Sequence, residues 1–389
     1  MANTDDAALT KPGAGSAPGT DLLSGAGVAP ASGFALAPGT ERWSLAREEV
    51  RVALAQRLTV AFLGPASAGK DSAIRALFGV DFGEIDPIPG STDQIRAVPL
   101  DASGQVVLVN APGFGDLRGE VDEAARTMLV EADVVVYVIN ADGGAHHDDR
   151  EFIAGLRAAG RPVVVCLNKI DLIRDRDRER FVEVTLSQLG VPPEDGFATA
   201  FDPLPVLSDV PMGTDAVTAR LVRLLDEQGK SLIFAKYLRH RGAACEPIVQ
   251  AAARKAAVAG AIPVPGADLA VVTALQVRMI LDIATVYEQD MDRDVALLIA
   301  GEALAGAGRG FVRWATNALK AAGWIPGGQL GEIAASAIGA TIAGASTYGV
   351  GRAAIAWMEQ AKAGRTPNAG ELREVFDRGA MYWRDGAAR

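Results

Sequence analysis

The stretch Gly64-Pro-Ala-Ser-Ala-Gly69-Lys70-Asp71-Ser72 decides the fold of this chain. It stands between an apolar run at 57–63, which predicts a buried strand, and a helical pattern that begins at Lys70. Glycines in such a loop let backbone N–H groups turn toward phosphate oxygens, and the helix start adds the positive end of its dipole. Lys70 can then reach the β and γ phosphates. The stretch therefore predicts a P-loop whose nucleotide-binding residues are Gly64, Ser67, Ala68, Gly69, Lys70, Asp71 and Ser72.

Further apolar runs surround this loop, at 105–110, 132–139 and 161–167. Their nearly continuous Val, Leu and Ile content is typical of strands that are covered on both faces. Helical patterns separate the runs, and alternating strands and helices indicate an α/β domain with a mostly parallel sheet and helices on both faces. The helical patterns lie at 41–56, 70–78, 121–131, 148–158, 174–189 and 215–227.

The 389 residues fit about two domains. Residues 1–40 are mostly Ala, Gly and Pro and cannot bury enough apolar surface to offset their ordering entropy, so we expect a disordered tail. Residues 41–230 form the α/β domain. After about Gln228 the chain becomes Ala-rich and helical, which predicts an all-helical second domain over 231–389.

A second motif, Asn168-Lys169-Ile170-Asp171, follows the strand predicted at 161–167. The Asp171 carboxylate can accept hydrogen bonds from the N1–H and the exocyclic amine of guanine, and adenine offers no such pair of donors. Buried polar pairing of this kind discriminates by a factor on the order of 10⁴ or more. Ser208, after the apolar run at 204–207, is expected to complete the base pocket. Its follower is Asp209, so only a backbone contact is expected there.

These motifs resemble those of the translation-factor-related GTPases, near the Era-like and dynamin-like branches. Thr92 lies where that family has its switch I threonine, and Asn110-Ala-Pro-Gly113 is similar to its Asp-Thr-Pro-Gly motif. The resemblance implies that GTP or GDP binds together with Mg²⁺. It also implies catalytic roles for Lys70, Thr92 and Gly113, and a metal site formed by Asp71, Thr92 and Asn110.

The chain departs from that family at two positions that concern the metal. Asp71 stands where the family has Ser or Thr, and Asn110 stands where it has Asp. A carboxylate about 4 Å from a phosphate costs roughly 4 kcal/mol at an effective dielectric constant near 20, and a Mg²⁺ ion between them reverses that sign. One hypothesis is therefore that Asp71 is a direct metal ligand and Asn110 its neutral neighbour. The alternative is a decayed site that binds nucleotide weakly or without metal.

Hydrolysis is expected to be slow. Phe114 follows Gly113, where many small GTPases place a Gln that orients the attacking water, and an apolar side chain cannot do this. We expect turnover to need an activating partner or self-association. Ser67 stands where potassium-dependent relatives have Asn, which leaves cation dependence open.

The second domain resembles the YcjF-like C-terminal domain that accompanies bacterial GTPases, through residues 257–269 and the apolar helix that follows. Between Glu332 and Arg352 there is no charge, a length that could span a bilayer, although most residues are small. Three interpretations stay open: a buried bundle helix, a membrane-associating hairpin and a true span. The spacing of Ala335, Gly339 and Ala343 favours close helix packing in either surrounding.

Smaller features fit the same scheme. His146-His147-Asp148-Asp149 suggests either a metal site or, preferably, a helix start with Asp148 near the N-cap. Arg278 and Asp282 are four apart on a helical pattern and are expected to pair. Cys166 and Cys245 lie too far apart in sequence to indicate a disulfide framework, which favours a reducing compartment.

The net charge of −10 argues against nucleic acid as a partner, because non-specific binding to nucleic acid is driven by phosphate contacts. The sequence therefore predicts a cytoplasmic guanine-nucleotide-binding protein, peripheral at the inner membrane if its helices bind lipid. It is expected to be a slow GTPase whose nucleotide state controls the helical domain. The expected partners are guanine nucleotide, a second copy or an activating protein, and a membrane surface. The alternatives are a non-hydrolysing pseudo-GTPase and a membrane-associated scaffold or remodelling protein.

Overall fold

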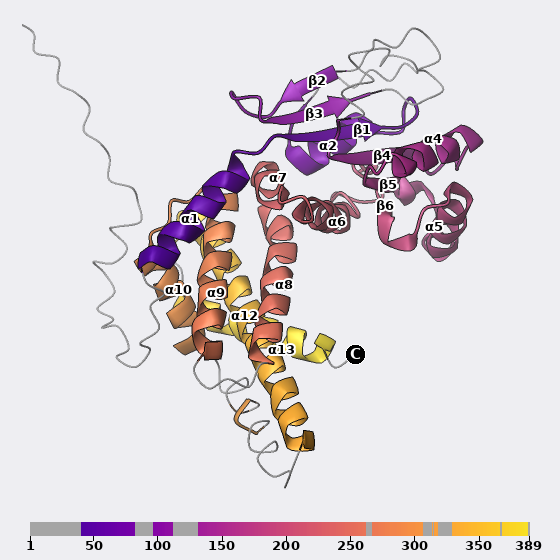
Figure 1. Cartoon of the computed structure of the whole chain (residues 1–389). Helices are drawn as coiled ribbons and strands as arrows, with labels where there is room; N and C mark the ends of the chain where they lie inside the picture. The colour runs from indigo at the N-terminus through magenta and orange to yellow at the C-terminus, as the bar shows by residue number, and fades with distance from the viewer. Residues whose placement is uncertain are drawn as a thin grey trace, which may run out of the picture.

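The computed structural model describes residues 40–81, 96–111, 131–261, 267–305, 313, 315–317, 329–365 and 368–387 (Figure 1). The tail expected at 1–40, apart from residue 40, lies outside the described residues. The helix expected at 121–131 also lies outside them, apart from residue 131.

The first part of the chain forms a six-stranded sheet in the order β2-β3-β1-β4-β5-β6. All neighbouring strands pair in parallel except β2 and β3, which are antiparallel. The strands are β1 (Leu58–Leu63), β2 (Arg96–Pro99), β3 (Val106–Asn110), β4 (Val134–Asn140), β5 (Val163–Asn168) and β6 (Gly196–Ala198). The mostly parallel α/β sheet predicted from the sequence is confirmed, with β2 and β6 as strands that the apolar pattern alone did not indicate.

Helices cover both faces of the sheet. The alternation of side chains along β1 shows this directly: Leu58, Val60 and Phe62 belong to one core, whereas Ala61 and Leu63 belong to another. The first core is closed by α2 (Lys70–Phe78) and α6 (Thr214–Asp226), and the second by α4 (His147–Ala158) and α5 (Asp175–Leu189). Burial on both faces explains why the strands read as nearly continuous apolar runs.

The second part of the chain is helical wherever it is described. Its long helices run side by side below the sheet, and the N-terminal α1 (Thr40–Leu54) lies against them (Figure 1). The helices are α7 (Ser231–Tyr237), α8 (Arg241–Gly260), α9 (Ala267–Val286), α10 (Arg293–Ala305), α12 (Gln329–Lys362) and α13 (Ala369–Ala387). Arg278 and Asp282 of α9 form the expected pair, with 2.9 Å between Nε and Oδ1.

The uncharged stretch of α12 is packed inside this bundle. Residues 343–351 are buried, and α8 crosses α12 so closely that a Cβ added to Gly339 would lie 2.4 Å from the carbonyl oxygen of Gly260. Small residues permit this approach, as the spacing around Gly339 predicted. The interpretation as a buried bundle helix is thus confirmed for 343–351. Among the residues that the structure describes, no helix combines the length and apolar character that crossing a bilayer requires.

The two parts share one continuous core. The cluster that contains β1, α2 and α6 extends through α7 into α8, α9 and α12 without interruption. At this junction the ring of Phe78 in α2 meets the ring of Phe234 in α7 edge-on, with 5.7 Å between centroids. The sheet and the helical bundle are therefore packed against each other through apolar side chains.

Candidate functional site

The P-loop connects the end of β1 to the start of α2, as the sequence predicted. Gly64 and Gly69 have φ values of 138° and 94°, and Ser67 between them has φ 60°. A Cβ on Gly64 would lie 2.0 Å from the carbonyl oxygen of Val138, and one on Gly69 would lie 2.2 Å from Nδ2 of Asn168. Both positions therefore require glycine, for backbone conformation and for space. Alternating backbone conformations of this kind turn N–H groups inward and form a concavity for anions.

Lys70 is the first residue of α2 and is only 5% exposed. Its Nζ donates to the carbonyl oxygens of Gly64 and Pro65, both at 2.9 Å. The ammonium group is thus held across the mouth of the loop, in the place where phosphate oxygens would be bound.

The base-recognition motif is tied directly to the P-loop. Asn168, the last residue of β5, donates through Nδ2 to the carbonyl oxygen of Ala68 at 2.8 Å. Its Oδ1 accepts from the backbone N–H of Phe201 at 3.0 Å, and the residue is 2% exposed. A single amide therefore fixes three loops that are distant in sequence. The two nucleotide motifs, 100 residues apart, are brought together as expected.

Asp171 lies on the short 3₁₀ turn η3 (Ile170–Leu172) and is 9% exposed. Its Oδ2 accepts from the backbone N–H of Leu204 at 3.2 Å. Since a carboxylate can accept about four hydrogen bonds, this bond orients the group and leaves capacity for two guanine donors. Lys169 precedes it with φ 62°, a left-handed conformation that turns the chain sharply at this point.

The position expected for Ser208 needs correction. Residues 204–207 are not a strand, and the Ser208 hydroxyl donates to the carbonyl oxygen of Val210 at 2.8 Å, within its own loop. The strand beside the base motif is β6, and it leads into Thr199 and Ala200. Backbone bonds join Thr199 to both sides of the motif, from its N–H to Leu167 at 2.9 Å and from its carbonyl oxygen to Ile170 at 3.0 Å.

Thr199 and Ala200 therefore border the base site where Ser208 was expected. The error came from the apolar run at 204–207, which is longer than β6 but exposed. β6 has only three residues, and its one signal in the sequence is the short Phe197-Ala-Thr-Ala200 run before a proline-rich loop.

The metal side of the site joins the two residues that depart from the family pattern. Asn110, at the end of β3, donates through Nδ2 to Oδ1 of Asp71 on the first turn of α2. Asn110 is 1% exposed, and its own Oδ1 is buried without a hydrogen-bond partner among the residues that the structure describes. A buried acceptor without a partner is costly and calls for a physical explanation.

An oxygen-seeking cation fits this arrangement. Mg²⁺ binds through one or two protein oxygens and completes its shell with phosphate oxygens and waters. A carboxylate at Asp71 and the free amide oxygen of Asn110 supply such donors, whereas the neutral Asn110 amide group keeps Asp71 in place. The described part of the chain holds no group of three or more His, Cys, Asp or Glu side chains that could bind a metal without the nucleotide.

The remaining predicted site residues divide into two groups. Ala68 and Ser72 lie on the P-loop and α2, where they were expected. Thr92 and Gly113 lie outside the described residues, as does Phe114.

The segment at 146–149 begins a helix, which is the interpretation that the sequence favoured over a metal site. The N-cap is His146, and Asp148 lies near it in the first turn, as expected. Asp149 closes the capping box by accepting from the backbone N–H of His146 at 3.2 Å. Asp149 also accepts from the Tyr137 hydroxyl at 2.6 Å. Cys166 is fully buried, and burial raises the pKa of its thiol, so this side chain packs as an unreactive group.

Comparison with known proteins agrees with this geometry. Residues 59–169 match the family model described as 50S ribosome-binding GTPase, and residues 224–379 match a domain of unknown function, DUF697. The GTPase Era of Desulfovibrio desulfuricans is 31% identical over 130 residues, which are 31% of this chain and 42% of that protein. The tRNA modification GTPase MnmE of Paraburkholderia xenovorans is 35% identical over 130 residues, 31% of this chain and 26% of that protein. The chain thus spans less than half the length of these relatives.

The solved structures that align with part of this chain include a probable GTP-binding protein, engB. It is 20% identical with a TM-score of 0.32, and the match covers 43% of this chain and 99% of that one. Another is Era in complex with MgGDPNP and nucleotides of 16S ribosomal RNA, at 20% identity and a TM-score of 0.32, covering 51% of this chain and 67% of that one. From the family match and the relatives, the chain carries a guanine-nucleotide-binding GTPase domain of the Era type, followed by a helical DUF697 domain.

Proposed function

We propose that this protein is a slow GTPase whose nucleotide state is transmitted to its helical domain. The observation that carries the proposal is the path of α2. This helix begins at Lys70, under the phosphates, and ends at Phe78, whose ring contacts Phe234 of α7. The carbonyl oxygen of Leu77 in the same turn accepts from the backbone N–H of Arg239 at 2.8 Å. A nine-residue helix thus connects the P-loop to the helical domain.

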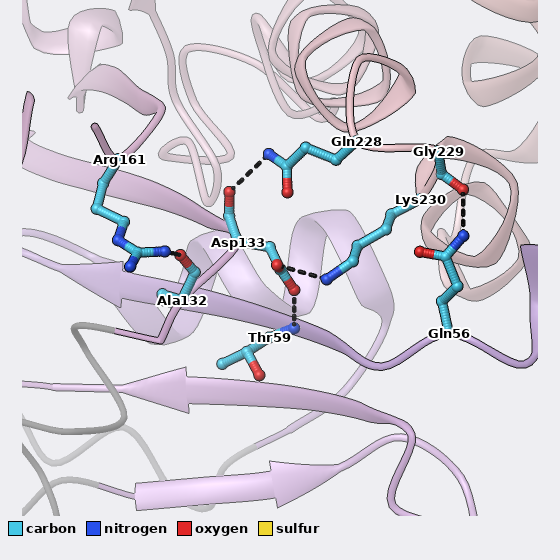
Figure 2. Close-up of polar contacts among 8 residues, drawn as sticks. All are labelled: Gln56, Thr59, Ala132, Asp133, Arg161, Gln228, Gly229 and Lys230. Carbon is cyan, nitrogen blue, oxygen red and sulfur yellow. Dashed lines mark hydrogen bonds and ion pairs between the residues drawn. The ribbon is translucent and has the colours of Figure 1, made fainter. Parts of the chain in front are cut away.

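A second connection lies at the opposite end of the sheet (Figure 2). Asp133, just before β4, accepts from the backbone N–H of Thr59 at 2.9 Å and from Nζ of Lys230 at 2.5 Å. Gln228 donates to the carbonyl oxygen of Asp133 at 3.1 Å, and Gln56 donates to that of Gly229 at 3.2 Å. The turn that begins the helical domain is therefore fastened to the starts of β1 and β4, whose other ends border the nucleotide site. We refer to these contacts of Asp133, Gln56 and 228–230 as the junction clamp.

The residues of the site have distinct roles in this proposal. Lys70 and the P-loop N–H groups bind the phosphates, and Asp171 selects guanine. Asp71 and Asn110 would hold Mg²⁺, which would supply positive charge beside the phosphate oxygens. Phe114 supplies no group that could orient water, so the rate is low without a partner.

A pseudo-GTPase is the second candidate function. One observation favours it, the Asp71 carboxylate beside the P-loop, which repels phosphate unless a cation lies between them. The two functions differ in their need for metal: an enzyme that uses Asp71 requires Mg²⁺ for turnover, whereas a decayed site binds nucleotide with no gain from Mg²⁺.

The test is phosphate release from GTP by the full chain, with and without Mg²⁺, using Lys70→Ala as the inactive control. We expect slow release that needs both Mg²⁺ and Lys70. Tight GTP binding without any release would replace the enzyme by the pseudo-GTPase. Release that Lys70→Ala leaves unchanged would assign the activity to a contaminant and contradict the proposal.

Transmission to the helical domain is tested by hydrogen exchange. We expect GDP and a non-hydrolysable GTP analogue to give different exchange rates in α7, α8 and α9, because the end of α2 contacts α7 directly. The matched control is Lys70→Ala with the same nucleotides. Identical rates in the two nucleotide states of the wild type would show that the helical domain does not respond.

Partners and location follow from the same reasoning. The acidic net charge of −10 argues against nucleic acid as a partner. We propose an activating protein or a second copy as the partner. We propose a cytoplasmic location, with peripheral binding at the inner membrane through the helical domain as the scaffold-like alternative. Flotation of the full chain with liposomes would separate these two locations.

A further inference from the structure

A guanidinium group holds the turn that carries the base-recognition carboxylate. Arg178 lies on the first turn of α5, and its Nε donates to the carbonyl oxygens of Ile170 at 3.0 Å and Ile173 at 2.9 Å. Its Nη2 donates to the carbonyl oxygen of Asp171 itself at 3.4 Å. These carbonyl oxygens belong to η3 and to the residue after it. The arginine side chain therefore spans the turn from its first residue to its end.

The turn needs an outside donor because it is short. The last carbonyl oxygens of a helical turn have no partner within the turn, and η3 has only three residues. The carbonyl oxygen of Ile170 accepts from the N–H of Ile173 at 3.0 Å. Among the described residues, the donor to the carbonyl oxygen of Asp171 is Arg178. An arginine that satisfies the carbonyl oxygens at the end of a helical turn stabilises that turn.

The guanidinium group is also fixed from its other side. Nη1 of Arg178 lies 2.7 Å from Oδ1 of Asp175, one turn earlier on α5. The side chain of Arg178 is 25% exposed, so the group lies between the helix and the turn and is only partly in solvent. The N–H groups of a guanidinium lie in one plane at fixed angles. With all three nitrogens engaged, the side chain fixes the orientation of η3 relative to α5.

Asp171 is thus held at both its side chain and its backbone. The N–H of Leu204 donates to Oδ2 of Asp171 at 3.2 Å, and Arg178 holds its carbonyl oxygen. The preceding Lys169 has φ 62°, a left-handed conformation that a residue other than glycine keeps only where the surrounding contacts impose it. The contacts of Arg178 lie directly after this residue and help to impose that conformation.

We infer that Arg178 is a positioning residue for guanine recognition, an inference that rests on the proposed binding of guanine by Asp171. Arg178 acts through the backbone of η3, which sets the place and the angle of the Asp171 carboxylate. The N1–H and the exocyclic amine of guanine both meet an acceptor only when the two carboxylate oxygens lie at the right distance and angle. Hydrogen bonds weaken steeply away from that geometry, so a loosened turn lowers base selection before it abolishes nucleotide binding.

The ratio of the affinities for GDP and inosine diphosphate tests this role. Hypoxanthine keeps the N1–H of guanine and lacks the exocyclic amine, so the ratio reports the second hydrogen bond to Asp171. We expect wild type to prefer GDP. Arg178→Met should weaken GDP binding about tenfold and lower the ratio at least about threefold, because it removes the donors to η3. Competition of each nucleotide with a fluorescent nucleotide on the full chain measures both affinities.

The matched control is Arg176→Met. It removes the same charge from the same helix, but the Arg176 side chain is 75% exposed and lies 3.6 Å from Asp177, its neighbour on α5. The GDP affinity and the ratio should both stay within about twofold of wild type. A general attraction between the arginine charges and the nucleotide phosphates would lower both affinities equally in both variants and leave the ratio unchanged.

Arg178→Lys is the conservative variant. It keeps the charge and loses the planar group, so its ratio should lie between those of wild type and Arg178→Met. If Arg178→Met does not fold, Arg178→Lys decides the test.

Two outcomes contradict different claims. A thermal stability that falls while the ratio stays at the wild-type value would make Arg178 a structural brace alone and overturn the inference, with the proposed function intact. A wild type that binds GDP no better than inosine diphosphate would contradict guanine selection by Asp171, and with it the proposed function.

Discussion

The two ends of the central sheet are built differently. At the carboxyl ends of the strands, Oδ1 of Asn110 and the Thr199 hydroxyl are buried without a hydrogen-bond partner within the described ranges. At the amino ends, Asp133 binds the backbone N–H of Thr59 with one carboxylate oxygen and Lys230 with the other. The carboxyl ends therefore form the candidate ligand site, whereas the amino ends join the sheet to the helical domain.

A buried acceptor without a partner destabilises the fold by about 1–3 kcal/mol, and a ligand that supplied a partner for Asn110 would remove this cost. One buried atom without a partner among the described residues also lies near the amino ends, Nε of Arg161. The junction clamp shows the opposite arrangement, in which paired groups fix the geometry of a joint. The following predictions test whether the two ends have these separate roles.

The largest expected effect is on guanine selection at the carboxyl end. Asp171→Asn replaces one carboxylate oxygen by an amide donor, so the two guanine donors no longer both meet an acceptor, and we expect GDP affinity to fall by a factor on the order of 10³. Xanthine nucleotides should recover much of it, because the Asn amide can donate to the additional carbonyl oxygen. Competition of GDP and of xanthosine diphosphate with a fluorescent nucleotide measures this change of base preference. A variant that still prefers GDP would show that Asp171 does not bind the base.

The second effect is on stability at the amino end. Asp133→Ala leaves the Lys230 ammonium, 20% exposed, without its partner, and we expect unfolding free energy to fall by about 2–4 kcal/mol. Urea denaturation measures it. GDP affinity should change by less than about threefold, since the clamp is at the other end of the sheet.

Asp133→Asn is the matched variant for this clamp. It keeps an acceptor for Thr59 and should cost less than Asp133→Ala. If Asp133→Ala weakens the free energy of GDP binding as much as it lowers the free energy of unfolding, the two ends of the sheet do not have separate roles.

A smaller effect is expected in the coupling between Asp71 and Asn110. If the two residues share one Mg²⁺ ion, Asp71→Ser and Asn110→Asp should each weaken Mg²⁺-dependent GDP retention, and the double variant should recover about 1–2 kcal/mol. The readout is the GDP dissociation rate as a function of Mg²⁺ concentration, together with direct Mn²⁺ binding. Strict additivity of the two changes would contradict a shared ion.

The smallest effect concerns pH and the helical domain. Burial raises the pKa of Asp282 to about 6, although the positive charge of Arg278 acts to lower it. The carboxyl group lines a cleft of about 450 Å³ between α1, α8 and α9. Because the folded state binds its proton more tightly than the unfolded state, stability falls as pH rises from about 4 to about 6 and stays lower above that.

We expect a loss of roughly 1 kcal/mol over this interval, moderated by solvent because the side chain is 19% exposed. Asp282→Asn should remove this component when unfolding curves at several pH values are compared with wild type. A variant with an unchanged pH profile would show that Asp282 does not titrate in this range.

Much of the site could be predicted from the sequence, because its motifs are local. The P-loop needs glycine at fixed positions, and the Asn168 to Asp171 motif needs a specific carboxylate, so both are readable as short patterns in the right place between strand and helix. The apolar runs likewise predicted the sheet, since burial on both faces leaves little room for polar residues. The pairing of Arg278 with Asp282 followed from helical spacing alone.

The tertiary structure decided what depends on contacts between distant segments. The sequence favoured Ser208 because its run is long and apolar, but only the pairing of β6 with β5 shows that Thr199 and Ala200 border the base motif. Only the fold brings Asn110 to Asp71, 39 residues apart, and Lys230 to Asp133, 97 residues apart. Local patterns report the backbone conformation and burial of each segment, whereas the partners of a side chain are set by the path of the whole chain, which no short pattern contains.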